Sequence, residues 1–175
     1  MTDVAVWVAA FTGGTAVLAS WVTNLGNVRA ARAQAEASAL AQQRDRVREL
    51  RRAAYLEFLE RAHLLGELYW RAESRFVQVA DPDQLLTDLQ ELRGELRGAY
   101  DPLMRSVRVI SLEGPAAPAE AAGTVLEAAA DTSRALWRFT LGEPEARARF
   151  DEGHQRFKRL LAQFVEAARE AMTAP

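Results

Sequence analysis

Residues 47–79 read VRELRRAAYLEFLERAHLLGELYWRAESRFVQV. At about 100° per residue, the apolar and small side chains of this segment fall on one face of a helix. That face carries Val47, Leu50, Ala54, Tyr55, Phe58, Ala62, Leu65, Leu68, Tyr69, Ala72, Phe76 and Val79. Charged residues such as Glu57, Glu60 and Glu67 fall on the other side. The pattern predicts a helix over about residues 47–80 that buries one face in a core.

Three more segments with the same period follow, and proline or glycine turns separate them. We expect helices over about residues 83–112, 116–140 and 144–173. The apolar stripe of the first of these runs straight through Pro102, which predicts one helix kinked at that proline. The alternative is a break at Asp101, because Asp-Pro is also a good start for a new helix.

Four amphipathic segments joined by short turns predict an all-α fold. We expect residues 47–173 to form an antiparallel four-helix bundle whose first helix is long. No segment shows the alternating pattern of a strand. At 175 residues the chain has room for one such domain and for a segment outside it.

A charge-free run, VAVWVAAFTGGTAVLASWVTNL, occupies residues 4–25. As a helix it would extend about 33 Å, enough to cross a hydrocarbon core of ~30 Å. Trp7 and Trp21 lie toward its ends, where an indole ring can sit at the membrane interface. These features predict a single transmembrane helix over residues 4–28, anchored in the lipid bilayer.

Arginines gather on the C-terminal side of the predicted span. They are Arg29, Arg32, Arg44, Arg46, Arg48, Arg51 and Arg52. Positive residues next to a span are retained in the cytoplasm, so we expect the N-terminus outside the cell membrane and the C-terminal domain in the cytoplasm. Residues 29–46, rich in Ala, Gln, Glu and Arg, predict a basic helical juxtamembrane stalk.

Two further roles for these segments stay open. The arginine cluster could bind anionic headgroups as well as fix the topology. Ala9 with Gly13, and Ala10 with Gly14, have the small-residue spacing that lets transmembrane helices approach closely. A homo-oligomer through the transmembrane or stalk helix is therefore an alternative to a monomer.

Composition excludes several classes of function. The chain has no cysteine, which removes disulfides and thiol catalysis, and no phosphate loop or dinucleotide fingerprint occurs. From residue 81 onward the chain has twelve basic residues against sixteen acidic ones, so we expect no nucleic-acid partner. We expect no cofactor and no enzymatic activity.

One pair of motifs resembles the carboxylate–histidine spacing of metal sites in helical bundles: Glu60 with His63, and Asp151 with His154. Glu60 and His63 fall opposite the core face, where a metal in the bundle centre is out of reach. His154 lies on an apolar stripe between Phe150 and Phe157, where a structural histidine is the more common outcome.

These observations predict a membrane-anchored helical bundle that acts as a protein-interaction module, such as a scaffold, sensor or adaptor, for a protein partner. The alternative is a metal-binding or enzymatic bundle that uses His154 with nearby carboxylates such as Asp151.

Overall fold

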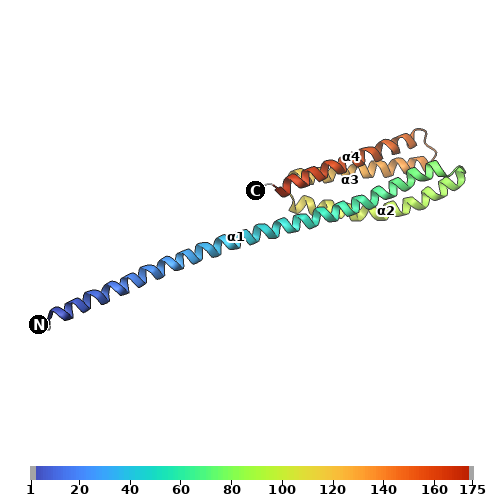
Figure 1. Ribbon diagram of the computed structural model, residues 1–175. Helices are drawn as coiled ribbons and strands as arrows, with labels where there is room; N and C mark the ends of the chain where they lie inside the picture. The colour runs from blue at the N-terminus through green and yellow to red at the C-terminus, as the bar shows by residue number, and fades with distance from the viewer. Residues whose placement is uncertain (1–2, 174–175) are drawn as a thin grey trace. The chain divides into compact units, whose positions relative to one another are not determined.

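The computed structural model describes residues 3–173, and their side chains from residue 31 onward except residue 33. This part of the chain forms four α-helices and contains no strand. They are α1 (Asp3–Gln78), α2 (Pro82–Glu113), α3 (Ala116–Thr140) and α4 (Ala146–Thr173) (Figure 1). The prediction of an all-α chain with a four-helix arrangement is confirmed.

The chain divides into two units, Met1–Val47 and Arg48–Pro175. In the first unit, every side chain that the structure describes is exposed, including that of Leu40. The second unit contains the hydrophobic core and is the bundle discussed below.

Within the described residues, no helix is both long enough and apolar enough to cross a membrane. The predicted span at residues 4–28 lies outside the residues whose side chains are described.

The bundle consists of the last part of α1, from residue 48, together with α2, α3 and α4. Short connections at residues 79–81, 114–115 and 141–145 reverse the chain each time, so successive helices run antiparallel (Figure 1). α3 packs against both α2 and α4. Aromatic side chains join α1 to α4, and a bidentate ion pair between Arg71 and Glu95 joins α1 to α2.

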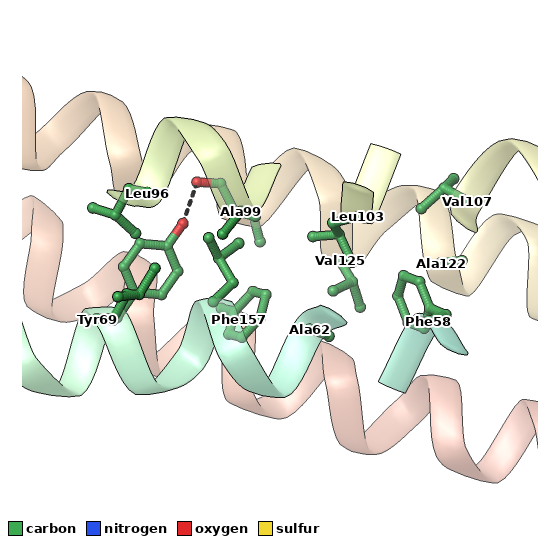
Figure 2. Close-up of a cluster of buried hydrophobic side chains, with 14 of the residues drawn as sticks. Phe58, Ala62, Tyr69, Leu96, Ala99, Leu103, Val107, Ala122, Val125 and Phe157 are labelled. Carbon is green, nitrogen blue, oxygen red and sulfur yellow. Dashed lines mark hydrogen bonds between the residues drawn. The ribbon is translucent and has the colours of Figure 1, made fainter. Parts of the chain in front are cut away.

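The core is a column of buried aromatic and aliphatic side chains along the bundle axis (Figure 2). The rings of Phe58 on α1 and Phe164 on α4 have centroids 4.4 Å apart. Tyr69 on α1 meets Phe157 on α4 edge-on at 5.6 Å. Ala62 and Ala72 are fully buried on the same face of α1, as its helical period predicts.

The predicted core face of the first helix is wrong at its first two positions. Val47 and Leu50 are 37% and 54% exposed, and burial begins at Ala54. For Leu50 the reason is the position at which α2 ends. The carbonyl of Glu113, the last residue of α2, accepts a hydrogen bond from Arg51, so α2 does not extend far enough to cover Leu50.

α2 begins at a complete N-terminal cap and runs through its internal proline. The carboxylate of Asp81 accepts a hydrogen bond from the N–H of Asp83 at 3.0 Å, and Pro82 takes the first turn, where no N–H is needed. Pro102 lies inside α2, so the stripe from Leu89 to Ile110 belongs to one helix and not to two.

Replacing Pro102 by Ala is expected to raise the free energy of unfolding by about 1 kcal/mol, because the new N–H can bond to the carbonyl of Gly98. Urea unfolding followed by circular dichroism measures the change. Gly98→Ala is the companion variant, since nothing lies within 4 Å of a Cβ built there. Gly98→Ala should therefore raise stability by about 0.5–1 kcal/mol, both in the wild type and beside Pro102→Ala. A loss of stability in Pro102→Ala itself would contradict the expectation.

The turn between α3 and α4 explains why α4 starts at Ala146. Gly142 has φ +79 and Glu145 has φ 66, so two of the five connecting residues have left-handed backbones that a helix does not allow. The N–H groups of Leu141 and Gly142 bond back to the carbonyls of Arg138 and Phe139 and close the end of α3.

α3 and α4 approach closely at Gly153. A Cβ built on this glycine would lie 2.7 Å from the hydroxyl oxygen of Thr132 and 3.3 Å from its Cα. Thr132 is fully buried, and its hydroxyl donates to the carbonyl of Ala128 at 2.7 Å. Only a residue without a side chain fits at this crossing.

Candidate binding groove

His154, the histidine that the sequence singled out, is a buried core residue on α4. Its side chain is 3% exposed, and its Nδ1 lies 2.8 Å from a carboxylate oxygen of Glu73 on α1. Its ring packs against Tyr69 and Phe150, with centroids 5.6 and 6.2 Å away. The interaction with Glu73 satisfies one polar atom of the imidazole and joins α1 to α4.

The other residues of the predicted metal motifs do not join His154. Asp151 binds the guanidinium of Arg147 at 3.0 Å, and Arg147 in turn lies 3.7 Å over the ring of Phe76. His63 is exposed on the outer side of α1, 3.2 Å from Glu67. Within the described residues no three histidine or acidic side chains form a cluster that could hold a metal ion.

His154→Leu is expected to keep the fold and to change the free energy of unfolding by less than about 1 kcal/mol. Leucine suits the aromatic surroundings, and Glu73, whose side chain is 27% exposed, can exchange the imidazole for water. Melting curves of the wild type and the variant, with and without chelator, together with elemental analysis, measure the effect. We expect chelator to leave both curves unchanged. Stoichiometric metal in the wild type that disappears in the variant would instead establish the metal-binding alternative.

The predicted interface and topology residues are only partly within the described region. The side chains of Trp7, Trp21 and Arg29 are not among those that the structure describes. Arg32, Arg44, Arg46, Arg48 and Arg52 are exposed. Arg51 differs from them because it is half-buried and its Nε donates to the carbonyl of Glu113 at 3.3 Å, at the C-terminal end of α2.

A groove of about 470 Å³ lies between α2 and α3. Small side chains on α3, Ala130 and Ser133, face larger ones on α2, so the two helices leave space between them. The lining residues are Arg93, Leu96, Arg97, Tyr100, Asp101, Ala130, Ser133, Arg134 and Trp137. A volume of this size is typical of ligand sites in proteins.

Aromatic rings provide the apolar surface of the groove. Trp137 is 41% exposed. The guanidinium of Arg93 lies 4.9 Å from the centre of the indole ring, a cation–π contact that holds both side chains at the rim. Tyr100 is half-buried on the opposite wall.

The charged groups of the groove are mainly cationic, and two of them, Arg93 and Arg97, have no carboxylate partner among the described residues. Arg134 is paired with Asp131, but neither Arg93 nor Arg97 forms an ion pair with any described residue. Burial raises the pKa of Tyr100; Arg134 opposes this increase and Asp101 adds to it. The Tyr100 hydroxyl therefore stays protonated at neutral pH and can donate a hydrogen bond to a ligand.

Ser133 connects the groove to the core. Its hydroxyl lies 2.9 Å from the hydroxyl of Tyr69, which donates to the carbonyl of Ala129 at 2.7 Å. Burial raises the pKa of Tyr69, and the bond to Ser133 opposes this increase. Two hydrogen bonds therefore link the Ser133 side of the groove to Tyr69 and to the carbonyl of Ala129 in the core.

Tyr69→Phe is expected to lower the free energy of unfolding by about 1–2 kcal/mol, because the buried carbonyl and Ser133 lose a partner. Tyr55→Phe is the matched control. The hydroxyl of Tyr55 is buried with no hydrogen-bond partner among the described residues. Its removal should therefore leave stability unchanged or raise it by up to about 1 kcal/mol. Equal losses in the two variants, measured by urea unfolding, would contradict the assignment of Tyr69 as the bonded hydroxyl.

A second cavity, of about 310 Å³, lies between α3 and α4 and shares Arg134 with the groove. Its other arginines already have carboxylate partners. Arg138 lies 3.9 Å from Glu143, and Arg149 lies 3.0 Å from Glu145. The second cavity is therefore less suited to a charged ligand than the groove between α2 and α3.

The groove combines an apolar floor, two aromatic walls and unpaired arginines, which is an arrangement for binding. The sequence analysis assigned none of these residues to a site. The available signal for the groove was that arginines, Tyr100 and Trp137 occur in two segments expected to be neighbouring helices. A comparison with protein-family models, with curated proteins and with solved structures finds no match to this chain.

Proposed function

We propose that the protein is a membrane-anchored interaction module whose helical bundle binds a protein partner through the groove between α2 and α3. The observation that carries the proposal is the groove itself, in which Trp137 and Tyr100 are accessible and Arg93 and Arg97 lack carboxylate partners. Exposed aromatic residues and arginines are the side chains most enriched in the energetically dominant part of protein interfaces.

The membrane anchor is the part of the proposal that rests on sequence alone. The charge-free run at residues 4–25, followed by arginines from Arg29 onward, supports a single span. The same arginines support a cytoplasmic bundle. An anchored bundle with an open groove would hold its partner at the inner face of the membrane, in the manner of a scaffold or adaptor.

Site-specific photocrosslinking in cells tests the interaction. p-Benzoylphenylalanine in place of Trp137 keeps an aromatic ring at the groove, and the same group in place of Thr124 lies on α3 but outside the groove. We expect a discrete light-dependent adduct from the first position and none from the second. Adducts at neither position, or at both equally, would count against the groove as the partner site.

Cysteine labelling tests the topology, because the chain has no cysteine of its own. Cysteine at exposed Ser38 or Thr124 should react with a membrane-impermeant thiol reagent only after the cells are opened. Ser106 is 3% exposed, so cysteine at Ser106 serves as a control that reacts only after unfolding. Labelling of Ser38→Cys in intact cells would overturn the orientation, and release of the protein without detergent would overturn the anchor.

A further inference from the structure

We propose that the groove between α2 and α3 takes an acidic segment of the partner protein. Carboxylates of that segment bind Arg93 and Arg97, and an aromatic or long aliphatic side chain enters between Tyr100 and Trp137. The inference rests on the proposed function, and it specifies the chemistry of the partner that the groove selects.

The groove lining is net positive, whereas the part of the chain that forms it is net negative. From residue 81 to the end, the chain carries more acidic than basic residues, sixteen against twelve. The groove lining nevertheless contains Arg93, Arg97 and Arg134 with Asp101 as its one acidic residue. A positive patch on a domain of net negative charge attracts a short acidic segment but gives no advantage to an extended polyanion.

The two edges of α2 differ in whether the arginines beside them have carboxylate partners. On the edge facing α1, Arg71 binds Glu95 with two hydrogen bonds of 2.6 and 3.1 Å, and Arg75 lies 3.4 Å from Asp88. The hydrogen bonds from Arg71 lower the pKa of Glu95. On the groove edge, Arg93 and Arg97 have no such partner in the described part of the chain. Two carboxylates supplied from outside would complete the pattern.

The apolar lining distinguishes an acidic peptide from a simple anion. Leu96 and Ala130 form the floor, and the rings of Tyr100 and Trp137 stand at the sides. Inorganic phosphate could bind the guanidinium groups, but it would leave this apolar surface in water. A peptide with carboxylates next to a large apolar side chain satisfies both parts of the groove, as an anchor residue in a pocket does in protein interfaces.

The test uses the full chain in a neutral detergent and a fluorescein-labelled synthetic peptide made of Glu and Leu with one central Trp. Fluorescence anisotropy reports binding. We expect saturable binding that falls as salt rises, and binding at least about tenfold weaker when every Glu of the peptide is replaced by Gln. Arg97→Glu should weaken binding by roughly tenfold or more, since it replaces an attraction by a repulsion.

Matched variants separate the groove from general charge. Arg105 is an exposed arginine on α2 outside the groove, so Arg105→Glu changes the net charge equally and should alter affinity by less than about twofold. Ala130→Phe, which fills the groove without changing charge, should abolish binding. Thr124→Phe on the other side of α3 should not. Circular dichroism checks that each variant is folded.

Several outcomes overturn the inference. Equal losses in Arg97→Glu and Arg105→Glu would show a non-specific charge effect, and equal binding of the Glu and Gln peptides would show that acidity is not recognised. Binding of O-phospho-L-serine that depends on Arg97, with no peptide binding, would make the groove a headgroup site.

If photocrosslinks form at position 137 in cells but the acidic peptide does not bind, the proposed function stands and the inference of an acidic partner fails. If the peptide binds but no crosslink forms, it is the proposed function that fails.

Discussion

Phe157→Ala is expected to lower the free energy of unfolding by about 3–5 kcal/mol, enough to remove most of the stability of a single bundle. Phe157 on α4 is 1% exposed and meets Tyr69 edge-on at 5.6 Å. Its ring also lies 3.5 Å from the position of a Cβ on Gly66 of α1. Removing it leaves a cavity between α1 and α4 that the helices cannot close without disturbing the aromatic column (Figure 2).

Urea unfolding of the full chain in neutral detergent, followed by circular dichroism, measures this loss. Lys158→Ala is the adjacent control; its side chain is exposed, so the change should stay within about 0.5 kcal/mol. Gly66→Ala adds a methyl group toward the same space and should recover part of the loss in the Phe157→Ala background. A decrease below about 1 kcal/mol in Phe157→Ala would mean that the bundle closes over the missing ring.

Gly153→Ala is expected to destabilise the bundle by about 1–3 kcal/mol, although alanine is the better helix former. The new Cβ would lie 2.7 Å from the hydroxyl oxygen of Thr132, a distance at which one of the two helices must move. Thr132 cannot easily turn away, because it is fully buried and β-branched and its hydroxyl is bonded to Ala128.

Two variants test the cause of this loss. Gly94→Ala on α2 has nothing within 4 Å of the new Cβ, so it should raise stability by about 0.5–1 kcal/mol. Thr132→Ala removes the oxygen that Gly153→Ala meets, so the double variant should lose less than the sum of the two single changes. Additive losses would show that the clash lies with the backbone of α3 and not with the hydroxyl.

The helical architecture followed from the sequence because it depends on local rules. A period near 3.6 residues and the proline or glycine turns between the segments each act within a few residues, and the structure has helices and turns at these places. The burial of His154 between Phe150 and Phe157 followed in the same way from its place on the stripe.

The partner of His154 did not follow from the sequence. Glu73 is 81 residues away, and it reaches the imidazole only because α1 and α4 pack side by side at that level. The nearby Asp151, which spacing favoured, is bound by Arg147 on its own helix. Spacing along one helix shows which side chains share a face, but it does not show which neighbouring helix covers that face.

The amino-acid sequence alone thus determined the helices, the order of the turns and most of the buried faces, although not the exposure of Val47 and Leu50. The tertiary structure decided where the groove lies. The groove exists only because small residues of α3, Ala130 and Ser133, meet larger residues of α2. The tertiary structure also decided which arginines are paired. Spacing along one helix cannot show that α2 places Glu95 beside Arg71 of α1, or that α3 places no carboxylate beside Arg93 and Arg97, because only the packing of whole helices brings these residues together.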